Sequence, residues 1–183
     1  MTDFLTTDYL ACGNKRQRHC HHLLVSNGIM EHLADYTPVV VGTIPINIDI
    51  PNSDVDIICR TKDFEAFERL LCDKFRKYGT FSIEKHKDNI SCSFEIENQL
   101  FEIYAEDIPV HCQNAYRHML IEYRILNLLG ESFRRRIVGL KSNGLKTEPA
   151  FASLLKLHGN PFSEILTLEN FSDTRIKELF LRK

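Results

Sequence analysis

Apolar β-branched residues and alternating apolar positions recur through the first half of the chain, and they predict strands. Val39–Val41 forms a short run typical of a buried strand, and residues 54–58 predict the start of a second strand. Residues 81–85 predict a third strand. Residues 91–104 predict a hairpin that turns at Glu97–Gln99, because apolar and polar positions alternate on both sides of that polar triplet.

Apolar positions with helical spacing fill the rest of the chain. A helix over 14–27 is expected to stop at Gly28, and the strongest helix, over 113–129, is expected to stop at Gly130. Beyond Gly130 the chain is expected to stay mostly helical to its end. The other predicted helices are a short one at 29–34 and an amphipathic one that begins at Asp63 and ends near Gly79.

Length and element order indicate one mixed α/β (α+β) domain over residues 1–183. A mixed sheet is expected within 1–110, flanked by helices, with a helical part over 111–183 packed on it. A chain of 183 residues is long enough for one sizeable core. Its 43% hydrophobic and 26% charged residues are ordinary for a globular protein.

Charge and apolar patterning narrow the expected partners and location. The net charge of −2 gives no overall attraction for nucleic acid, so no extended nucleic-acid footprint is expected. No apolar run reaches the roughly 20 residues of a membrane span, and a signal-peptide core is not found. Six cysteines without close pairing favour reduced thiols, and hence a cytoplasmic location.

Two carboxylates at the start of the second strand are the strongest chemical signal. Asp54 and Asp56 are two residues apart on a strand, so both project from the same face, toward the turn at Gly42–Thr43. Mg²⁺ takes one or two protein carboxylates and fills its other sites with water and substrate phosphates. The pattern therefore predicts a Mg²⁺ site that faces a polyphosphate. The alternative is an Asx-type turn at Asn52–Asp54 with Asp56 solvated.

A third acid is expected on the hairpin. Glu102 alternates with the apolar residues Phe101 and Ile103, so it projects from a strand face and is available to complete the metal site. Glu95 is the competing candidate. Its arm also carries Glu97, as a solvated face would.

These residues resemble the pattern of the nucleotidyltransferase superfamily typified by DNA polymerase β: a Gly-Ser-like turn, about ten residues, Asp-x-Asp, and a later strand acid. Residues 42–59 and 113–119 carry a closer likeness to a small bacterial branch of domains of about this length. The resemblance implies a nucleotidyltransferase-like fold and Mg²⁺-dependent transfer of a nucleoside monophosphate from a nucleoside triphosphate. Mn²⁺ is an alternative metal. The acceptor hydroxyl is undetermined: a small molecule, a tRNA end or a protein.

The same resemblance implies roles for individual residues. Asp54, Asp56 and Glu102 match the catalytic metal ligands. The phosphate-facing positions are Gly42, Thr43 and Ser53.

The segment after Gly42 departs from the superfamily pattern. A helix usually follows the Gly-Ser turn there, whereas residues 44–51 alternate with period two and contain two prolines, which predicts an extended arm or edge strand. No Lys or Arg occurs between Met30 and Arg60. Cationic phosphate partners must come from elsewhere in the chain.

The helix over 113–129 offers candidates for the missing contacts. Arg117 is the candidate for binding phosphate through two N–H groups of its guanidinium, with Lys141 or Lys146 as second choices. Tyr116 is the candidate ring for stacking on the nucleotide base. The alternative is that this helix is central and presents a solvated charged stripe.

Three alternatives to a nucleotidyltransferase site have some support in the sequence. A nucleotide-binding or regulatory module of the same fold, without catalysis, is favoured by the missing cations after Gly42. A phosphohydrolase of the haloacid dehalogenase type places its acids at the end of a strand, whereas here Asp54 and Asp56 open one. A zinc site at His19–His22 lacks a second pair of ligands at the usual spacing.

Overall fold

A computed structural model describes residues 2–181 of the chain. These residues form two compact units. The first comprises the chain up to Asn47 together with 53–116, and the second comprises 48–52 and the chain from Arg117 onward. One domain over residues 1–183 stays a prediction. None of the helices within 2–181 combines the length and the apolar character needed to span a membrane.

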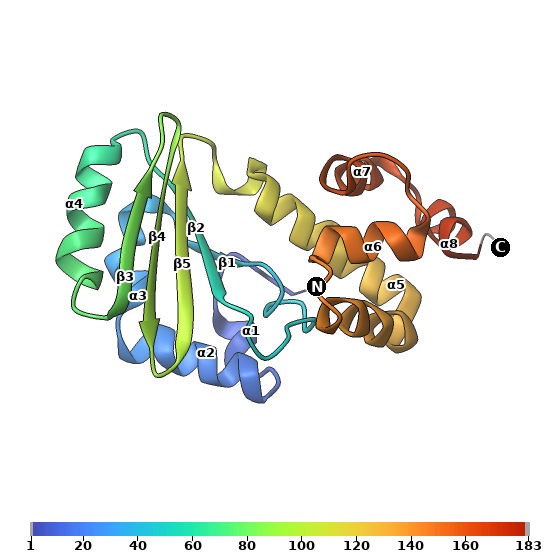
Figure 1. Cartoon of the computed structure of the whole chain (residues 1–183), viewed down its shortest axis with the longest axis horizontal. Coiled ribbons are helices and arrows are strands. Elements are labelled where there is room, and N and C mark those ends of the chain that lie inside the picture. The colour runs from blue at the N-terminus through green and yellow to red at the C-terminus, as the bar shows by residue number, and fades with distance from the viewer. Residues whose placement is uncertain (1, 182–183) are drawn as a thin grey trace. The chain divides into compact units, whose positions relative to one another are not determined.

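A five-stranded mixed sheet forms the centre of the first unit (Figure 1). Its order is β1-β2-β5-β4-β3, and β2 and β5 are parallel while all other neighbours are antiparallel. The mixed sheet and its flanking helices confirm the predicted α/β fold class. The strands are β1 Val39–Val41, β2 Val55–Arg60, β3 Gly79–Lys85, β4 Asn89–Ile96 and β5 Gln99–Glu106.

The alternation of apolar and polar residues separates the two faces of this sheet. Phe94 and Phe101 stack in register across β4 and β5, and both lie in the main hydrophobic cluster, which includes residues from α1 to α4. Their neighbours Ser93 and Glu102, also in register, therefore project from the opposite face. β4 and β5 join through Glu97 and Asn98, whose φ angles of 51° and 62° are typical of a tight two-residue hairpin.

The helices of the first unit match the predicted positions, with one correction. An Asn14–Gln17 capping box starts α2, close to the predicted residue 14. The amphipathic helix α4 begins as expected after its N-cap Asp63, but it ends at Phe75, before Gly79, which already belongs to β3. Gly79 pairs with Glu95 of β4, so the chain must leave the helix before residue 79, and Phe75 and Tyr78 both stack on Phe94 of β4. The helices are α1 Asp8–Ala11, α2 Lys15–Ser26, α3 Ile29–His32 and α4 Phe64–Phe75, with 3₁₀ turns at Ala34–Tyr36 and Val110–Cys112.

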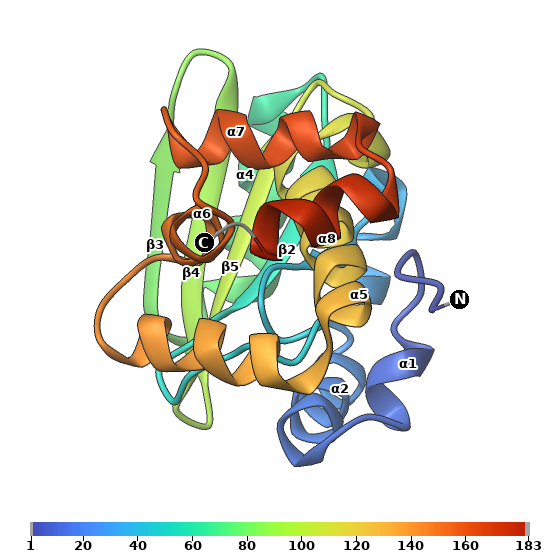
Figure 2. The same ribbon diagram turned by 90° about the vertical axis from the view of Figure 1, so that its right-hand side faces the viewer.

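The second unit is helical, and Figure 2 shows its helices α6, α7 and α8. Gly130 adopts a φ of 76° and interrupts α5, which confirms the predicted break at that residue. Beyond it, Phe133 makes edge contacts with the rings of Phe151 in α6 and Phe180 in α8, so these helices share one core. The elements are α5 Asn114–Ser142, whose first three residues belong to the first unit, α6 Thr147–Leu155, α7 Pro161–Thr167, a 3₁₀ turn Leu168–Asn170 and α8 Asp173–Leu181.

Candidate metal centre

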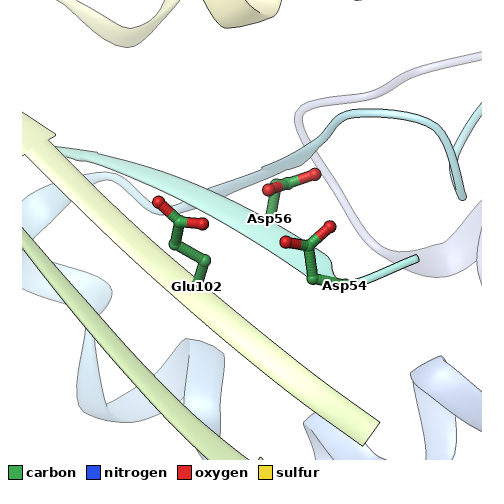
Figure 3. Close-up of side chains that lie close together, drawn as sticks. All are labelled: Asp54, Asp56 and Glu102. Atoms are coloured by element: carbon green, nitrogen blue, oxygen red, sulfur yellow. The ribbon is translucent and has the colours of Figure 1, made fainter. Parts of the chain in front are cut away.

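Three carboxylates meet where β2 begins. Asp56 on β2 and Glu102 on β5 are paired positions of the parallel ladder, and Asp54 lies one residue before β2. Each acid offers an oxygen within 4.8 Å of the oxygens of the other two. Figure 3 shows the three side chains pointing toward one another. The predicted third acid is therefore in this group, whereas Glu95 lies on β4 opposite Leu100 and is not part of it.

The chemistry of this donor set fits a hard divalent cation. Octahedral Mg²⁺ binds oxygen at about 2.0–2.1 Å, so two of its ligand oxygens lie at most about 4.2 Å apart, and each of the three acids offers an oxygen within 4.8 Å of the other two. Burial, followed by the nearby charges of Asp54 and Glu84, raises the pKa of Glu102 above its usual value. Like charges this close disfavour joint ionisation, and a cation between them removes that cost.

The backbone of Gly42 lies directly against the carboxylate of Asp56. Its φ is +80°, a conformation that residues with a side chain rarely adopt, and a Cβ built on it would overlap the Asp56 carboxylate. Position 42 therefore needs glycine for two independent reasons. The predicted closeness of the Gly42 turn and the Asp-x-Asp strand is explained by β1 and β2, which pair Val41 with Asp56.

The segment after Gly42 is a series of turns, and the extended arm predicted for 44–51 is wrong over residues 44–47. Asn47 N donates to Ile44 O at 3.2 Å, and Asn47 has a φ of 58°. Gln17 from α2 donates its amide to the carbonyls of Ile44 and Pro45, at 2.9 and 3.1 Å. Pro45 is buried together with its neighbours Ile44 and Ile46, so the two faces of a strand are not present here and the period-two pattern belongs to a turn segment packed in the core.

Ser53, one residue before Asp54, is held by three side chains. Arg16 Nη2 and Gln99 Nε2 both donate to Ser53 O, at 2.8 and 3.1 Å. Thr43 Oγ1 donates to Ser53 Oγ at 3.4 Å, so the structure brings two of the predicted phosphate-facing residues together. Arg16 and Gln99 are not among the site residues that the sequence predicts. The sequence pattern places Gln99 in the hairpin turn, but it is the first residue of β5 and is only 2% exposed.

The remaining predicted contacts lie on α5. Arg117 Nε and Nη2 donate to the two carboxylate oxygens of Glu169 at 2.9 and 2.6 Å. Tyr116 is buried, and that burial, followed by the charge of Asp3, raises its pKa. Lys141 is also buried and donates to the carbonyl of Ile48 at 2.8 Å. The roles predicted for Arg117 and Tyr116 stay predictions.

Solved structures with the same fold define the class to which this arrangement belongs. The Cid1 poly(U) polymerase bound to MgATP superposes with a TM-score of 0.57 at 10% identity, over 88% of this chain and 54% of that one. Its MgGTP-bound form gives 0.56 at 11% identity, over 88% and 54%. A cytoplasmic RNA terminal U-transferase gives 0.51 at 13% identity, over 84% and 46%. The chain thus has a nucleotidyltransferase-like fold and spans about half the length of these proteins.

The chain belongs to the family described as a domain of unknown function, DUF4269, whose family model matches residues 22–168. That match contains the sheet, the three acids and the kinked helix α5. No curated protein matches the sequence.

Proposed function

We propose that the protein is a Mg²⁺-dependent nucleotidyltransferase that transfers a nucleoside monophosphate from a nucleoside triphosphate to a hydroxyl acceptor. The observation that carries the proposal is the convergence of Asp54, Asp56 and Glu102 beside the Gly42 turn. The nucleotidyltransferase-like fold supports it, because Asp56 and Glu102 lie on paired strands of that fold and Asp54 immediately precedes one of them. Mn²⁺ has the same preference for oxygen ligands and is an alternative metal.

The residues of this site suit the chemistry of phosphoryl transfer. Asp54, Asp56 and Glu102 would hold the metal, which when bound neutralises phosphate charge and polarises the α-phosphate. The hydroxyls of Thr43 and Ser53 are hydrogen-bond donors for phosphate oxygens. The acceptor oxygen bonds to the α-phosphorus, the α–β phosphoanhydride bond breaks, and pyrophosphate leaves.

Glu102 is the acid assigned to the acceptor proton. Its raised pKa makes it a better proton acceptor than an ordinary carboxylate, and it is the most exposed of the three acids.

The test uses the full chain with each nucleoside triphosphate, Mg²⁺ or Mn²⁺, and three acceptor sets: small alcohols and sugars, tRNA, and the protein itself. Pyrophosphate release and label transfer from the α-phosphate are measured. We expect metal-dependent release with the parent and none with Asp56→Asn. Equal release by parent and variant would contradict the role of the acids.

A second candidate function is a nucleotide-binding or regulatory module that keeps the fold without transfer. The absence of Lys and Arg between Met30 and Arg60 favours it. Calorimetry distinguishes the two, because the module binds nucleoside triphosphate with the metal but releases no pyrophosphate with any acceptor.

A further inference from the structure

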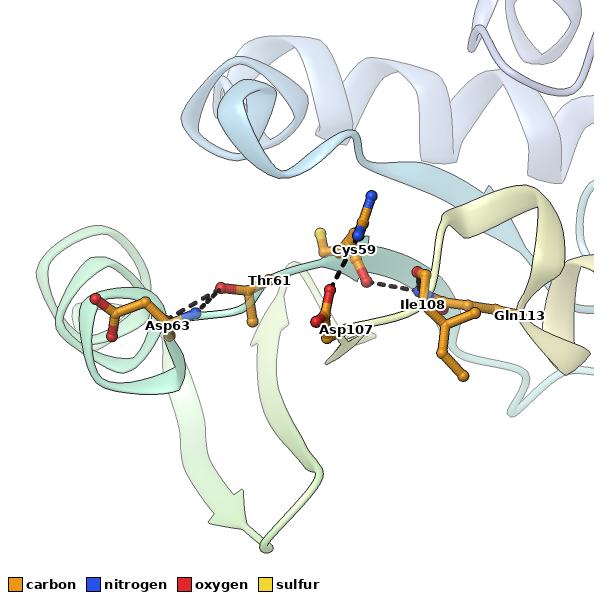
Figure 4. A network of polar contacts seen from close by, with 7 residues as sticks. Cys59, Thr61, Asp63, Asp107, Ile108 and Gln113 are labelled. Atoms are coloured by element: carbon orange, nitrogen blue, oxygen red, sulfur yellow. Dashed lines mark hydrogen bonds and ion pairs between the residues drawn. The ribbon is translucent and has the colours of Figure 1, made fainter.

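Strand β2 is held near each end by the amide of a buried glutamine. Gln99 Nε2 donates to Ser53 O at 3.1 Å and to Leu100 O at 2.8 Å. At the other end, Gln113 Nε2 donates to Cys59 O at 2.8 Å and to Ile108 O at 2.9 Å (Figure 4). Both side chains are at most 2% exposed, and each has a buried Oε1 without a hydrogen-bond partner. The two glutamines make matched contacts at opposite ends of one strand.

The two aspartates of the metal centre are held by different means. Asp56 is paired in the sheet on both sides, with Val41 of β1 and Glu102 of β5. The ladder between β2 and β5 begins at Val55 and Phe101, one residue after Asp54. Asp54 therefore lies outside the ladder, and the side chains that bond the carbonyl of Ser53 hold the backbone immediately before it.

Two donors from different elements converge on the Ser53 carbonyl. Gln99 comes from β5, and its second bond, to Leu100 O, ties the start of β2 to the strand that carries Glu102. Arg16 comes from α2, where the capping box of Asn14 and Gln17 fixes the first turn. Because the guanidinium is planar and held by a half-buried side chain, it fixes direction as well as distance.

We propose that Arg16 and Gln99 are positioning residues for Asp54, which set its carboxylate at the distance from Glu102 that a divalent metal requires. The proposal rests on the metal site of the proposed function. Outer-shell partners that orient metal ligands typically change metal affinity by about 10–100-fold when they are removed.

Single substitutions separate positioning from general stabilisation. Gln99→Met and Arg16→Met remove one donor each at similar side-chain length. We expect each to weaken Mn²⁺ binding about tenfold in calorimetry, measured well below the unfolding temperature. Gln113→Met removes the matched contacts at the far end of β2, and Arg18→Met removes a neighbouring charge from α2, whose guanidinium bonds Gly13 O. Both controls should bind Mn²⁺ as the parent does.

Charge and position are separated by two comparisons. Gln99 is neutral, so its effect on Mn²⁺ affinity does not arise from net charge. Arg16→Lys keeps the charge but loses the planar fork, and a positioning role predicts that it restores only part of the affinity. The proposal would be overturned if Arg16→Lys had the full Mn²⁺ affinity of the parent and Gln99→Met had no effect on that affinity. The charge at position 16, and not its geometry, would then explain the binding.

Double variants give the decisive test. In an Asp54→Asn background, Gln99→Met should cost no further Mn²⁺ affinity, because the positioned ligand is already lost. In a Glu102→Gln background the full loss should remain. Equal losses in both backgrounds, or single variants that bind as tightly as the parent, overturn the positioning role and leave the proposed function standing. A parent protein that binds no Mn²⁺ overturns both.

Discussion

The carboxylate of Asp56 occupies the space that a side chain at position 42 would need. Gly42→Ala would have to move that carboxylate and also hold an alanine at a φ of +80°. We expect a loss of about 1–3 kcal/mol in the free energy of unfolding from the backbone strain. Mn²⁺ binding should weaken as well, because the displaced acid is a metal ligand. Urea denaturation and calorimetry measure the two effects.

Gly139→Ala is the matched control. Gly139 lies inside α5 with nothing within 4 Å of the added Cβ, and its φ is not positive. Alanine there should leave Mn²⁺ binding unchanged and stabilise the helix by about 0.5–1 kcal/mol. Equal Mn²⁺ affinity of Gly42→Ala and Gly139→Ala would show that Gly42 does not shape the site.

Asp54→Asn should have opposite effects with and without metal. Asp54 contributes to the raised pKa of Glu102, so it disfavours the ionised Glu102 of the folded protein. Neutralising it lowers that pKa, and the metal-free variant should unfold at a higher temperature than the parent at neutral pH. Ligand binding at about 100 times Kd stabilises a folded protein by about 2.7 kcal/mol. At a Mn²⁺ concentration that saturates the parent, the unfolding temperature should rise less for this variant than for the parent, because its Mn²⁺ affinity is lower.

Glu102→Gln should weaken Mn²⁺ binding less than Asp54→Asn or Asp56→Asn, because Glu102 is the more exposed acid and is assigned to the acceptor proton. Titration of each variant with Mn²⁺ gives the order of affinities. If Glu102→Gln loses the most affinity, Glu102 is a principal metal ligand and its assignment as the base is wrong.

The positions of the acids were predictable because strand periodicity decides them. Alternation along residues 99–106 puts Phe101 and Ile103 in the core and Glu102 on the other face, and the structure follows that pattern. The same rule failed for residues 44–47, which form turns although apolar residues alternate there. Pro45, between two buried isoleucines, is buried as well, and a strand with one solvated face would expose it.

Contacts between distant segments explain what else was missed. Arg16 and Ser53 are 37 residues apart, and Gln99 and Ser53 are 46 apart. The composition of α2 or of the hairpin turn contains no signal for such contacts, because a polar residue in a turn is usually solvated. The sequence does contain one indication that Gln99 is buried. It is two residues before Phe101, so the alternation of β5 places both side chains on the buried face.

Glu122 provides a pH-dependent prediction for the second unit. It is buried, and that burial, followed by the charge of Glu148, raises its pKa well above the ordinary value of 4.5, while Lys141 opposes the shift. An acid whose pKa is higher in the folded state binds its proton more tightly there. The contribution of Glu122 to the free energy of unfolding therefore falls as the pH rises from its pKa in the unfolded chain through its higher pKa in the folded protein. Glu122→Gln should reduce this loss of stability as the pH rises above the ordinary carboxyl value, which urea denaturation over a series of pH values measures.

Glu131→Gln controls for the general effect of removing a charge from α5. Glu131 has a 67% exposed side chain and pairs with Arg134. Its removal should leave the slope of stability against pH unchanged, since an exposed ion pair contributes little. Equal slopes for the parent and Glu122→Gln would show that Glu122 does not titrate differently in the folded protein.

Arg117 is the candidate for binding phosphate through two N–H groups of its guanidinium. Its guanidinium makes two bonds with Glu169, and the hydrogen bond from Arg117 is the main cause that lowers the pKa of that carboxyl. A phosphate would have to compete with Glu169 for the same planar donors. A charge-assisted hydrogen bond contributes about 1.5–3 kcal/mol, so Arg117→Ala should weaken nucleotide binding by about ten- to a hundredfold at low salt.

Glu169→Gln provides the opposing change, because it removes the competing charge and keeps the side-chain shape. If Arg117 binds phosphate, Glu169→Gln should tighten nucleotide binding while Arg117→Ala weakens it, and neither should alter Mn²⁺ affinity. If Arg117 serves only the ion pair, both variants lose the same small amount of stability, within about 1 kcal/mol, and nucleotide affinity stays that of the parent. Calorimetric titration with a non-hydrolysable nucleoside triphosphate, in the presence of Mn²⁺, distinguishes the two outcomes.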